Sequence, residues 1–304
     1  MKRLSILAAA LGWLSLANPA AAQYITYVAT NGNDANPCTV VTAPCKTLQR
    51  SVNVTTANGT VRVLTPLISS VFINKSITIE GVRPTIVGQI TIGGAAAVVT
   101  LRGLALDGVG GYVNGIRIDS AAKVHIEDCT VERYNGSGIN LVATTATQLF
   151  VSETVSRDNS SSGLQADAVN ARVQIENSRF EGNVDYGLYL KVAKANVVRS
   201  TASENNHGMY LYGGTANVTE TTAANNGNNG FQIAGGGATL AFSVVRGNDL
   251  GLVIEPGASV TITDSVITSN VSYAVVNSGA LYTRQNNTVG GSTLGSAAIA
   301  IGAY

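Results

Sequence analysis

The sequence predicts an all-β fold, a right-handed parallel β-helix, in which about ten coils of one chain stack into a solenoid behind an N-terminal cap. The first observation behind this prediction is an asparagine that recurs every 21 to 24 residues. A fixed period of this length is typical of a solenoid, in which each repeat is one coil stacked on the previous one. Side-chain amides in one column can hydrogen-bond from coil to coil at a turn. The asparagines of this column are Asn159, Asn183, Asn205, Asn226, Asn248 and Asn270.

The second observation is that three short strand patterns surround each asparagine, without helical periodicity between them. Apolar and polar residues alternate in these patterns, which is typical of half-buried strands. A right-handed connection is the default between parallel strands, and residues 61–288 accommodate roughly ten coils that rise about 4.8 Å each. The first pattern starts at Gly115, Gly138, Gly163, Gly187, Gly208, Gly230 and Gly251, and the second at Ile77, Val99, Val124, Leu149, Val173, Ala195, Ala216, Ala238 and Val260. The third is expected to point small residues inward at Cys129, Thr154, Ser178, Ser200, Thr221, Ser243 and Ser265.

This organisation resembles the pectate-lyase-like superfamily of right-handed parallel β-helices, of the secreted bacterial type. Residues 27–34 and 43–49 resemble the entry segment of such proteins, and the resemblance implies a strand, a turn and a short amphipathic helix that cover the open end of the solenoid. A cap is needed because an uncovered coil exposes strand edges and apolar core. We therefore expect a cap at residues 23–60 and the β-helix at 61–289. The tail, residues 290–304, is expected either to fold over the last coil or to mediate association.

Residues 1–22 have the pattern of a secretory signal peptide. Lys2 and Arg3 precede an apolar run, and three alanines at 20–22 give a small-residue cleavage site before Gln23. The apolar run is short for a membrane span, and no integral membrane segment is expected in the mature chain. The predicted location is extracellular or periplasmic.

The charge balance disfavours nucleic acid and anionic membranes as partners. Without Lys2 and Arg3, the 19 basic residues become 17, against 18 acidic residues. The only tryptophan is Trp13, in the predicted signal peptide, so an aromatic platform for a sugar must consist of tyrosine or phenylalanine. The expected partner is a polysaccharide, and the oligomeric state stays open.

The cysteines and histidines predict a disulfide and no metal site. Cys38 and Cys45 lie close together in an exported segment, where oxidising conditions favour a disulfide. Cys129 is expected to be a buried free thiol in place of a serine. Only two histidines are present, and no spacing indicates zinc. No cofactor is expected. Calcium stays possible, although the sequence shows no cluster of ligands for it.

In β-helix enzymes that this chain resembles, the substrate usually lies along the outside of one sheet, and the order of strands around the asparagine turn makes the glycine-led strands similar to that sheet. Their outward residues include tyrosines, amides, carboxylates and a lysine in neighbouring rungs. Tyrosine rings pack on apolar sugar faces, and polar groups bind hydroxyls or a uronate. The glycines are expected to leave a shallow trough along one margin. Alternatively, the tyrosines stack only to stabilise the sheet. The predicted substrate-binding residues are Arg117, Asp119, Gln165, Asp167, Tyr189, Tyr212 and Gln232.

The turn before these strands adds Asp185 and His207 in adjacent coils, where their side chains are expected to meet. Elimination or epimerisation of a uronate needs a base for the C5 proton, a neutralised carboxylate and often a tyrosine as acid. Lys191 or His207 is the expected base, Tyr189 or Tyr210 the acid, and Arg117 or Lys191 the neutralising cation. The predicted catalytic residues are therefore His207, Lys191, Asp185 and Tyr210.

Glycoside hydrolysis is less favoured, because it needs a second carboxyl group at a defined separation. The best pair, Asp119 and Asp167, is about 9.6 Å apart by coil rise. Lyases that the fold resembles carry acidic calcium clusters and a catalytic arginine, and neither is evident here. We expect an exported β-helix that interacts with a polysaccharide, for which two functions stay open. One is a lyase or epimerase acting on an acidic polysaccharide, and the other is a non-catalytic surface protein, adhesin-like or polysaccharide-binding, whose long rigid face is the function. The short, uniform turns from Ala195 to Tyr273 favour the second function.

Overall fold

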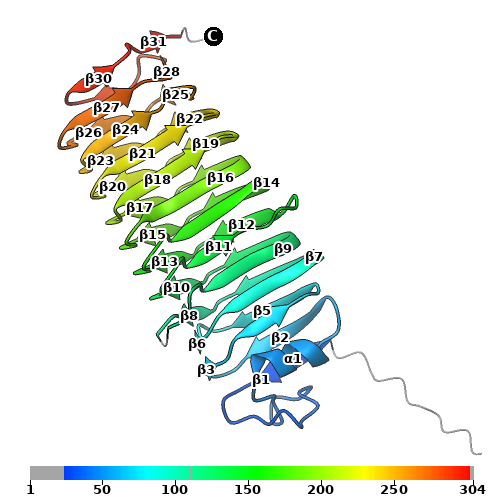
Figure 1. Cartoon of the computed structure of the whole chain (residues 1–304). Helices are drawn as coiled ribbons and strands as arrows, with labels where there is room; N and C mark the ends of the chain where they lie inside the picture. The colour runs from blue at the N-terminus through cyan, green and yellow to red at the C-terminus, as the bar shows by residue number, and fades with distance from the viewer. Residues whose placement is uncertain (1–23, 110, 302–304) are drawn as a thin grey trace, which may run out of the picture.

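The protein is an elongated rod of stacked strands, with the first described strands at one end and the last described strands at the other (Figure 1). The computed structural model describes residues 24–109 and 111–301. The predicted signal peptide, residues 1–22, and its cleavage site before Gln23 lie outside the described residues. All the strand pairs within the rod are parallel, as the repeat predicts.

One sheet of the rod contains 11 strands, one from each coil. The solenoid therefore has eleven turns, slightly more than the roughly ten that the sequence predicts. The strands of this sheet are β3 (Leu67–Ile68), β6 (Thr85–Val87), β8 (Ala105–Asp107), β10 (Thr130–Glu132), β13 (Val155–Arg157), β15 (Arg179–Glu181), β17 (Thr201–Ser203), β20 (Thr222–Ala224), β23 (Val244–Arg246), β26 (Val266–Thr268) and β29 (Thr288–Val289).

The other sheet has 20 strands and contains both the glycine-led set and the second set of the predicted strands. In four coils the two sets join into one long strand: β7 (Ile90–Arg102), β9 (Ile116–Glu127), β14 (Leu164–Glu176) and β16 (Tyr186–Val198). The separate glycine-led strands are β4 (Val71–Ile73), β11 (Ile139–Leu141), β18 (His207–Tyr212), β21 (Asn229–Ala234), β24 (Leu250–Ile254), β27 (Tyr273–Asn277) and β30 (Thr293–Gly295). The separate strands of the second set are β1 (Ile25–Val28), β2 (Gly59–Val63), β5 (Ile77–Gly81), β12 (Gln148–Ser152), β19 (Thr215–Thr219), β22 (Gly237–Ala241), β25 (Ser259–Thr263), β28 (Ala280–Thr283) and β31 (Ile299–Ala300).

In most coils the chain turns through two left-handed corners, one before and one after the strand of the 11-stranded sheet. In the coil that holds β15, Asn177 has a φ of 48° before the strand and Gly182 has a φ of 65° after it. Such corners are unfavourable for most residues with a side chain. Each is followed by a buried polar residue, here Ser178 and Asn183. The corners and the polar residues therefore form a repeated device that folds the chain back at a fixed place in every coil.

The predicted asparagine ladder is confirmed. The side-chain nitrogen of Asn183 donates to the side-chain oxygen of Asn205 at 2.9 Å, and the backbone N–H of Asn183 donates to the same oxygen at 2.9 Å. The Asn205 side chain then donates to Asn226 at 3.2 Å, and Asn226 to Asn248 at 2.8 Å. Because each amide joins two coils, the ladder sets the register between them and satisfies polar groups that are buried at the corner.

The column of buried hydroxyls lies at the corner before each strand of the 11-stranded sheet. The sequence had predicted these residues within the three-residue strands, so their position is corrected. Each hydroxyl accepts from the backbone N–H of the coil before it, as Ser200 does from Ser178 at 3.2 Å. The inward residues of the strands themselves vary in size, from Ala202 in β17 to Phe180 in β15. Cys129 occupies this column as a free, buried thiol, and burial raises the pKa of the thiol to about 11, so it stays protonated.

The leading glycines do not form a trough, which corrects the sequence prediction. Their missing side chains would point inward. A Cβ on Gly208 would lie 2.4 Å from the carbonyl oxygen of Gly230 and 2.9 Å from the side-chain nitrogen of Asn226. Gly187 and Gly163 have the same kind of neighbours. The glycines therefore make room for the asparagine ladder inside the rod, and the outer surface of the glycine-led strands is shaped by other residues.

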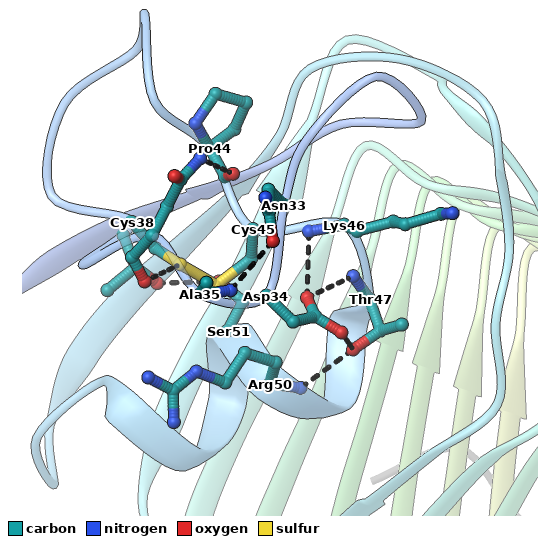
Figure 2. The surroundings of a disulfide bond; sticks show 12 residues. Asn33, Asp34, Ala35, Cys38, Pro44, Cys45, Lys46, Thr47, Arg50 and Ser51 are labelled. Atoms are coloured by element: carbon teal, nitrogen blue, oxygen red, sulfur yellow. Dashed lines mark hydrogen bonds between the residues drawn. A yellow bond between two sulfur atoms is a disulfide. The ribbon is translucent and has the colours of Figure 1, made fainter.

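The N-terminal segment combines β1, a disulfide and the helix α1 (Leu48–Val54). Cys38 and Cys45 form the disulfide that the sequence predicts (Figure 2). Asp34 accepts hydrogen bonds from the backbone N–H groups of Lys46 and Thr47 and from the Thr47 hydroxyl. Although burial would raise the pKa of Asp34, these hydrogen bonds hold it below its ordinary value.

The helix packs against the first strands of the solenoid. Thr47 accepts from the backbone N–H of Arg50 as the N-cap, and Leu48 and Val52 are buried in the core. At the other end of the rod, β30 and β31 pair in parallel with β27 and β28 and thereby continue the main sheet. The described part of the chain contains no helix with the length and apolar character of a membrane span.

We predict that Asn205→Ala destabilises the protein by about 2–3 kcal/mol, because two donors of Asn183 and the carbonyl oxygen of Phe180 lose their buried partner. Urea unfolding, followed by circular dichroism, measures the effect. The matched control is Asn206→Ala, at an exposed amide one residue along the chain, where a change within about 0.5 kcal/mol is expected. Equal urea concentrations at the unfolding midpoints of the two variants would contradict a structural role for the ladder.

Candidate functional site

The outward residues of the glycine-led strands form the columns that the sequence predicts. In the first column Gln165 pairs in register with Tyr189, and Tyr189 with Tyr210. In the second column Asp167 pairs with Lys191 on the next coil. Rungs of a parallel sheet lie about 4.8 Å apart. We call the surface formed by the residues of these rungs and of the turn before them the tyrosine face; it contains Gln165, Asp167, Tyr186, Tyr189, Lys191, His207, Tyr210 and Tyr212.

Four aromatic rings pack together at the centre of the tyrosine face. The ring of Tyr186 stacks on that of His207, with centroids 4.9 Å apart, and on that of Tyr210, at 5.7 Å. Tyr189 meets Tyr186 edge-on at 5.4 Å and lies 5.4 Å from Tyr210. Offset and edge-on contacts at these separations are favourable. The rings support one another and form a continuous aromatic surface over two coils.

Tyr186 is the residue of this cluster that the sequence prediction did not assign. It precedes the glycine of its strand and so lies outside the alternating pattern from which the outward columns were predicted. The structure shows that it pairs in register with His207. The signal that could have found it is its place in the turn, since His207 was predicted from the equivalent position of the next coil.

His207 is held by this stacking and is largely removed from water. Its Nδ1 atom is buried without a hydrogen-bond partner. Burial lowers the pKa of the imidazole below its ordinary value, although the nearby Asp185 carboxylate acts in the opposite direction. The ring is therefore neutral at pH 7. Because Nδ1 is buried, Nε2 is the nitrogen that a ligand would meet.

Lys191 lies between an acid and an aromatic ring. Its Nζ atom is 3.2 Å from a carboxylate oxygen of Asp167 and 5.7 Å from the ring centroid of Tyr212. The hydrogen bond to Asp167 raises the pKa of Lys191, which therefore stays protonated at neutral pH. A protonated lysine cannot act as a base, so among the two predicted bases the geometry favours His207.

Tyr210 is protonated at neutral pH. Burial, followed by the negative charge of Glu255, raises the pKa of its hydroxyl to about 12. Burial and the charge of Asp167 also raise the pKa of Tyr189. Both hydroxyls can donate a hydrogen bond to a ligand oxygen, whereas neither is suited to act as a base.

The other predicted residues lie on the same sheet but make separate contacts. Arg117 is on the strand β9, three rungs before Tyr189, and pairs with Asp119 at 2.7 Å. Gln165, one rung before Tyr189, accepts from the hydroxyl of Ser137 at 3.0 Å. Gln232, one rung after Tyr210, accepts from Asn229 at 2.7 Å and donates to Glu255.

Asp185 is adjacent to the aromatic cluster through its backbone. The contact recorded between Asp185 and His207 is a hydrogen bond from the His207 backbone N–H to the Asp185 carbonyl oxygen, at 2.9 Å. Their side chains form no ion pair in the structure. The Asp185 carboxylate therefore acts on the imidazole through its charge.

The site has no evident metal ligands. In residues 24–109 and 111–301, no three histidine, cysteine or carboxylate side chains come together in an arrangement that could hold an ion. A role for calcium or another cofactor stays an open expectation.

The repeat itself identifies the family. Residues 89–245, more than half of the chain, match the family model described as a right handed beta helix region. The chain belongs to this family. The match covers the coils of the tyrosine face and the part of the ladder from Asn159 to Asn226, so both lie on the repeats that define the family.

Several solved structures are similar to this right-handed β-helix. The A-module of the mannuronan C-5 epimerase AlgE4 of Azotobacter vinelandii has a TM-score of 0.57 at 20% sequence identity, over 74% of this chain and 72% of that module. The pectate lyase Pel9A has 16% identity and a TM-score of 0.45, over 86% of this chain and 69% of that one. A rhamnogalacturonan lyase has 13% identity and a TM-score of 0.44, over 79% and 84%. At these identities the likeness is one of fold. No curated protein matches the sequence.

We predict that both histidines titrate below the ordinary value of about 6.5, because burial lowers both pKa values. As the pH falls below about 6.5, the unfolded chain takes up these protons first, so stability decreases towards acid pH.

Replacing Tyr186 by alanine uncovers His207 and should raise its pKa towards 6.5. The ring-proton NMR signals of the two histidines measure this, and His125, which stacks on Phe150 elsewhere, is the internal control. An unchanged His207 pKa in the variant would contradict burial by Tyr186.

Proposed function

We propose that this protein is an exported polysaccharide-binding β-helix whose tyrosine face receives the sugar chain. The observation that carries the proposal is the packed cluster of Tyr186, Tyr189, His207 and Tyr210 on adjacent coils. Rings fixed in this way lose little conformational freedom when a flat apolar sugar face packs on them. The fold likeness to the A-module of a mannuronan C-5 epimerase supports a polysaccharide as the partner.

The polar groups around the rings suit the hydroxyl groups of sugars. Tyr189 and Tyr210 hold protons that they can donate, and Gln165, Gln232 and Asp167 supply donors and acceptors on the neighbouring rungs. Lys191 is the cation that would bind a uronate carboxylate. It would then either leave Asp167 or contact both carboxylates. Export to the periplasm or the extracellular space is part of this proposal and is supported by the signal-peptide pattern of residues 1–22.

We predict that Tyr189→Ala together with Tyr210→Ala weakens binding to an acidic polysaccharide by on the order of tenfold or more, because two stacking surfaces are lost. Affinity electrophoresis in gels that contain pectin, alginate or a glycosaminoglycan measures the binding. About 0.5 M salt in the running buffer screens exposed charges, so that the aromatic contribution dominates. The control is Tyr282→Ala, a tyrosine of β28 in the second strand set. Equal retention of the double variant and the unaltered protein would remove the tyrosine face as the binding surface.

A second candidate function is proton transfer at C5 of a uronate, favoured by the neutral imidazole beside protonated tyrosines. Nε2 of His207 would take the C5 proton, and the electron pair left at C5 would delocalise into the carboxyl group, stabilised by Lys191. Return of a proton to the opposite face of C5 gives the epimer. Alternatively, cleavage of the bond from C4 to the glycosidic oxygen gives a C4=C5 double bond, and Tyr210 would donate a proton to the leaving oxygen. The competing possibility is a non-catalytic, adhesin-like rod.

The catalytic candidate predicts a uronate product that depends on His207. With pectin, alginate or a glycosaminoglycan as substrate, elimination produces an unsaturated uronate that absorbs in the ultraviolet, and epimerisation in deuterated water places deuterium at C5. His207→Gln should abolish either signal, while Tyr282→Ala, on β28 of the second strand set, should leave it unchanged. No product from any of the three polysaccharides would favour the non-catalytic rod.

A further inference from the structure

A second surface of the rod combines unpaired cations with an aromatic ring. It lies on the outward side of the second strand set, around the bend from the tyrosine face. The register aligns Lys123, Gln148, Arg172 and Lys194 in one column over four coils. The next column aligns His125, Phe150, Gln174 and Asn196. We call this surface the cationic groove; its residues are the eight of these two columns.

The groove is a concave feature of the surface. A hollow of about 210 Å³ is lined by Gln148, Leu149, Phe150, Arg172, Val173, Gln174, Lys194 and Asn196. The ring of His125 stacks on Phe150, with centroids 4.8 Å apart and planes within 9°. The Nζ atom of Lys123 lies 5.7 Å from the ring centroid of Phe150. The hollow thus has an aromatic platform with cations beside it.

The cations of the groove differ from most others on the rod in having no acidic partner. Neither Lys123, Arg172 nor Lys194 forms an ion pair with any carboxylate in the part of the chain that the structure describes. By contrast, eight arginines do: Arg62, Arg83, Arg102, Arg117, Arg133, Arg157, Arg179 and Arg199.

Acidic residues near the groove are already neutralised. In the third column of the same strands, Glu127 is 2.8 Å from Arg102, and Glu176 is 2.6 Å from Arg199. Glu127 also lies 3.6 Å from Nδ1 of His125, but Lys123, Arg172 and Lys194 have no carboxylate partner among the described residues, although the whole sequence has a net charge of only +1.

The positive segment has clear limits along the rod. The rung before Lys123 carries Val98 in the same column, and the rung after Lys194 carries Thr215. Three cations within four rungs, which lie about 4.8 Å apart, span about 14 Å along the axis. A regular polyanion that runs parallel to the rod would meet one cation after another, while a single small anion would use only one of them.

We propose that the cationic groove binds a carboxylate-bearing polysaccharide, with a sugar ring against Phe150 and uronate carboxylates at Arg172 and Lys194. The planar guanidinium of Arg172 matches a carboxylate in two hydrogen bonds, and the three amides, Gln148, Gln174 and Asn196, suit sugar hydroxyls. The aromatic ring distinguishes the groove from a merely solvated patch of charge, because ring packing needs an apolar ligand face. This site is separate from the tyrosine face and does not rest on its proposed function.

The test compares variants that remove positive charges inside and outside the groove, at low and high salt. Arg172→Gln together with Lys194→Gln should weaken binding of the full-length protein to polygalacturonate by roughly fivefold to tenfold at low salt, because two exposed charge contacts are lost. The difference should shrink at about 0.5 M salt. Phe150→Ala should weaken binding at both salt concentrations. Arg246→Gln, which removes an exposed positive charge from the 11-stranded sheet, is the control and should change the affinity by less than about twofold.

Other probes identify the class of ligand. Neutral dextran should bind less tightly than polygalacturonate, and dextran sulfate and duplex DNA separate carboxylate recognition from general attraction to polyanions. Tyr189→Ala with Tyr210→Ala should leave the low-salt effect of the groove variants intact, so the two surfaces are tested independently. The proposal is overturned if the groove variants bind polygalacturonate like the unaltered protein. It is also overturned if Phe150→Ala has no effect while sulfate and DNA bind as tightly as polygalacturonate.

Discussion

The hydrogen bond that one side chain makes to the next coil is the interaction on which the rest of this structure depends. Asn183, Asn205, Asn226 and Asn248 each donate to the following amide, and each oxygen also accepts from the backbone N–H of the preceding coil. The chain must turn sharply at this point through a left-handed residue, and the amide satisfies groups that the turn buries. Register between coils follows from this contact. Every functional surface described above is a consequence of that register, because it converts a spacing of about 22 residues into a distance of one rung.

The same contact explains the glycines that begin the strands. A side chain at Gly187 or Gly230 would meet the amide nitrogen of the ladder at 2.8 or 2.7 Å. The need for glycine is therefore internal, and the outer surface is free to carry large side chains directly afterwards. Tyr189 and Tyr210 each lie two residues after such a glycine. The stabilising ladder and the aromatic surface thus belong to the same short segment of each coil but point to opposite sides of the sheet.

Much of this arrangement could be predicted from the sequence, because strand alternation and a coil period together determine which residues point outward and which are neighbours. The columns that contain Tyr189, Tyr210, Asp167 and Lys191 follow from those two regularities alone. Other features depend on information that a pattern does not hold. A glycine has no side chain to indicate which side it faces, so its role was misjudged. Tyr186 precedes the alternating segment, and its contact with His207 depends on the path of a turn. The pairing of Lys191 with Asp167 depends on side-chain conformation, and it reverses the role expected of that lysine as a base.

The two surfaces for which we propose polysaccharide binding differ in how their charges are paired. The tyrosine face offers stacked rings with paired charges, whereas the cationic groove offers unpaired charges around one ring. If residues one coil apart form one continuous binding surface, a crystal structure with a bound oligosaccharide will show it. We expect a sugar ring within about 4 Å of the rings of both Tyr189 and Tyr210. A sugar seated only on the 11-stranded sheet, or strands in which these two tyrosines are not on adjacent rungs, would contradict it.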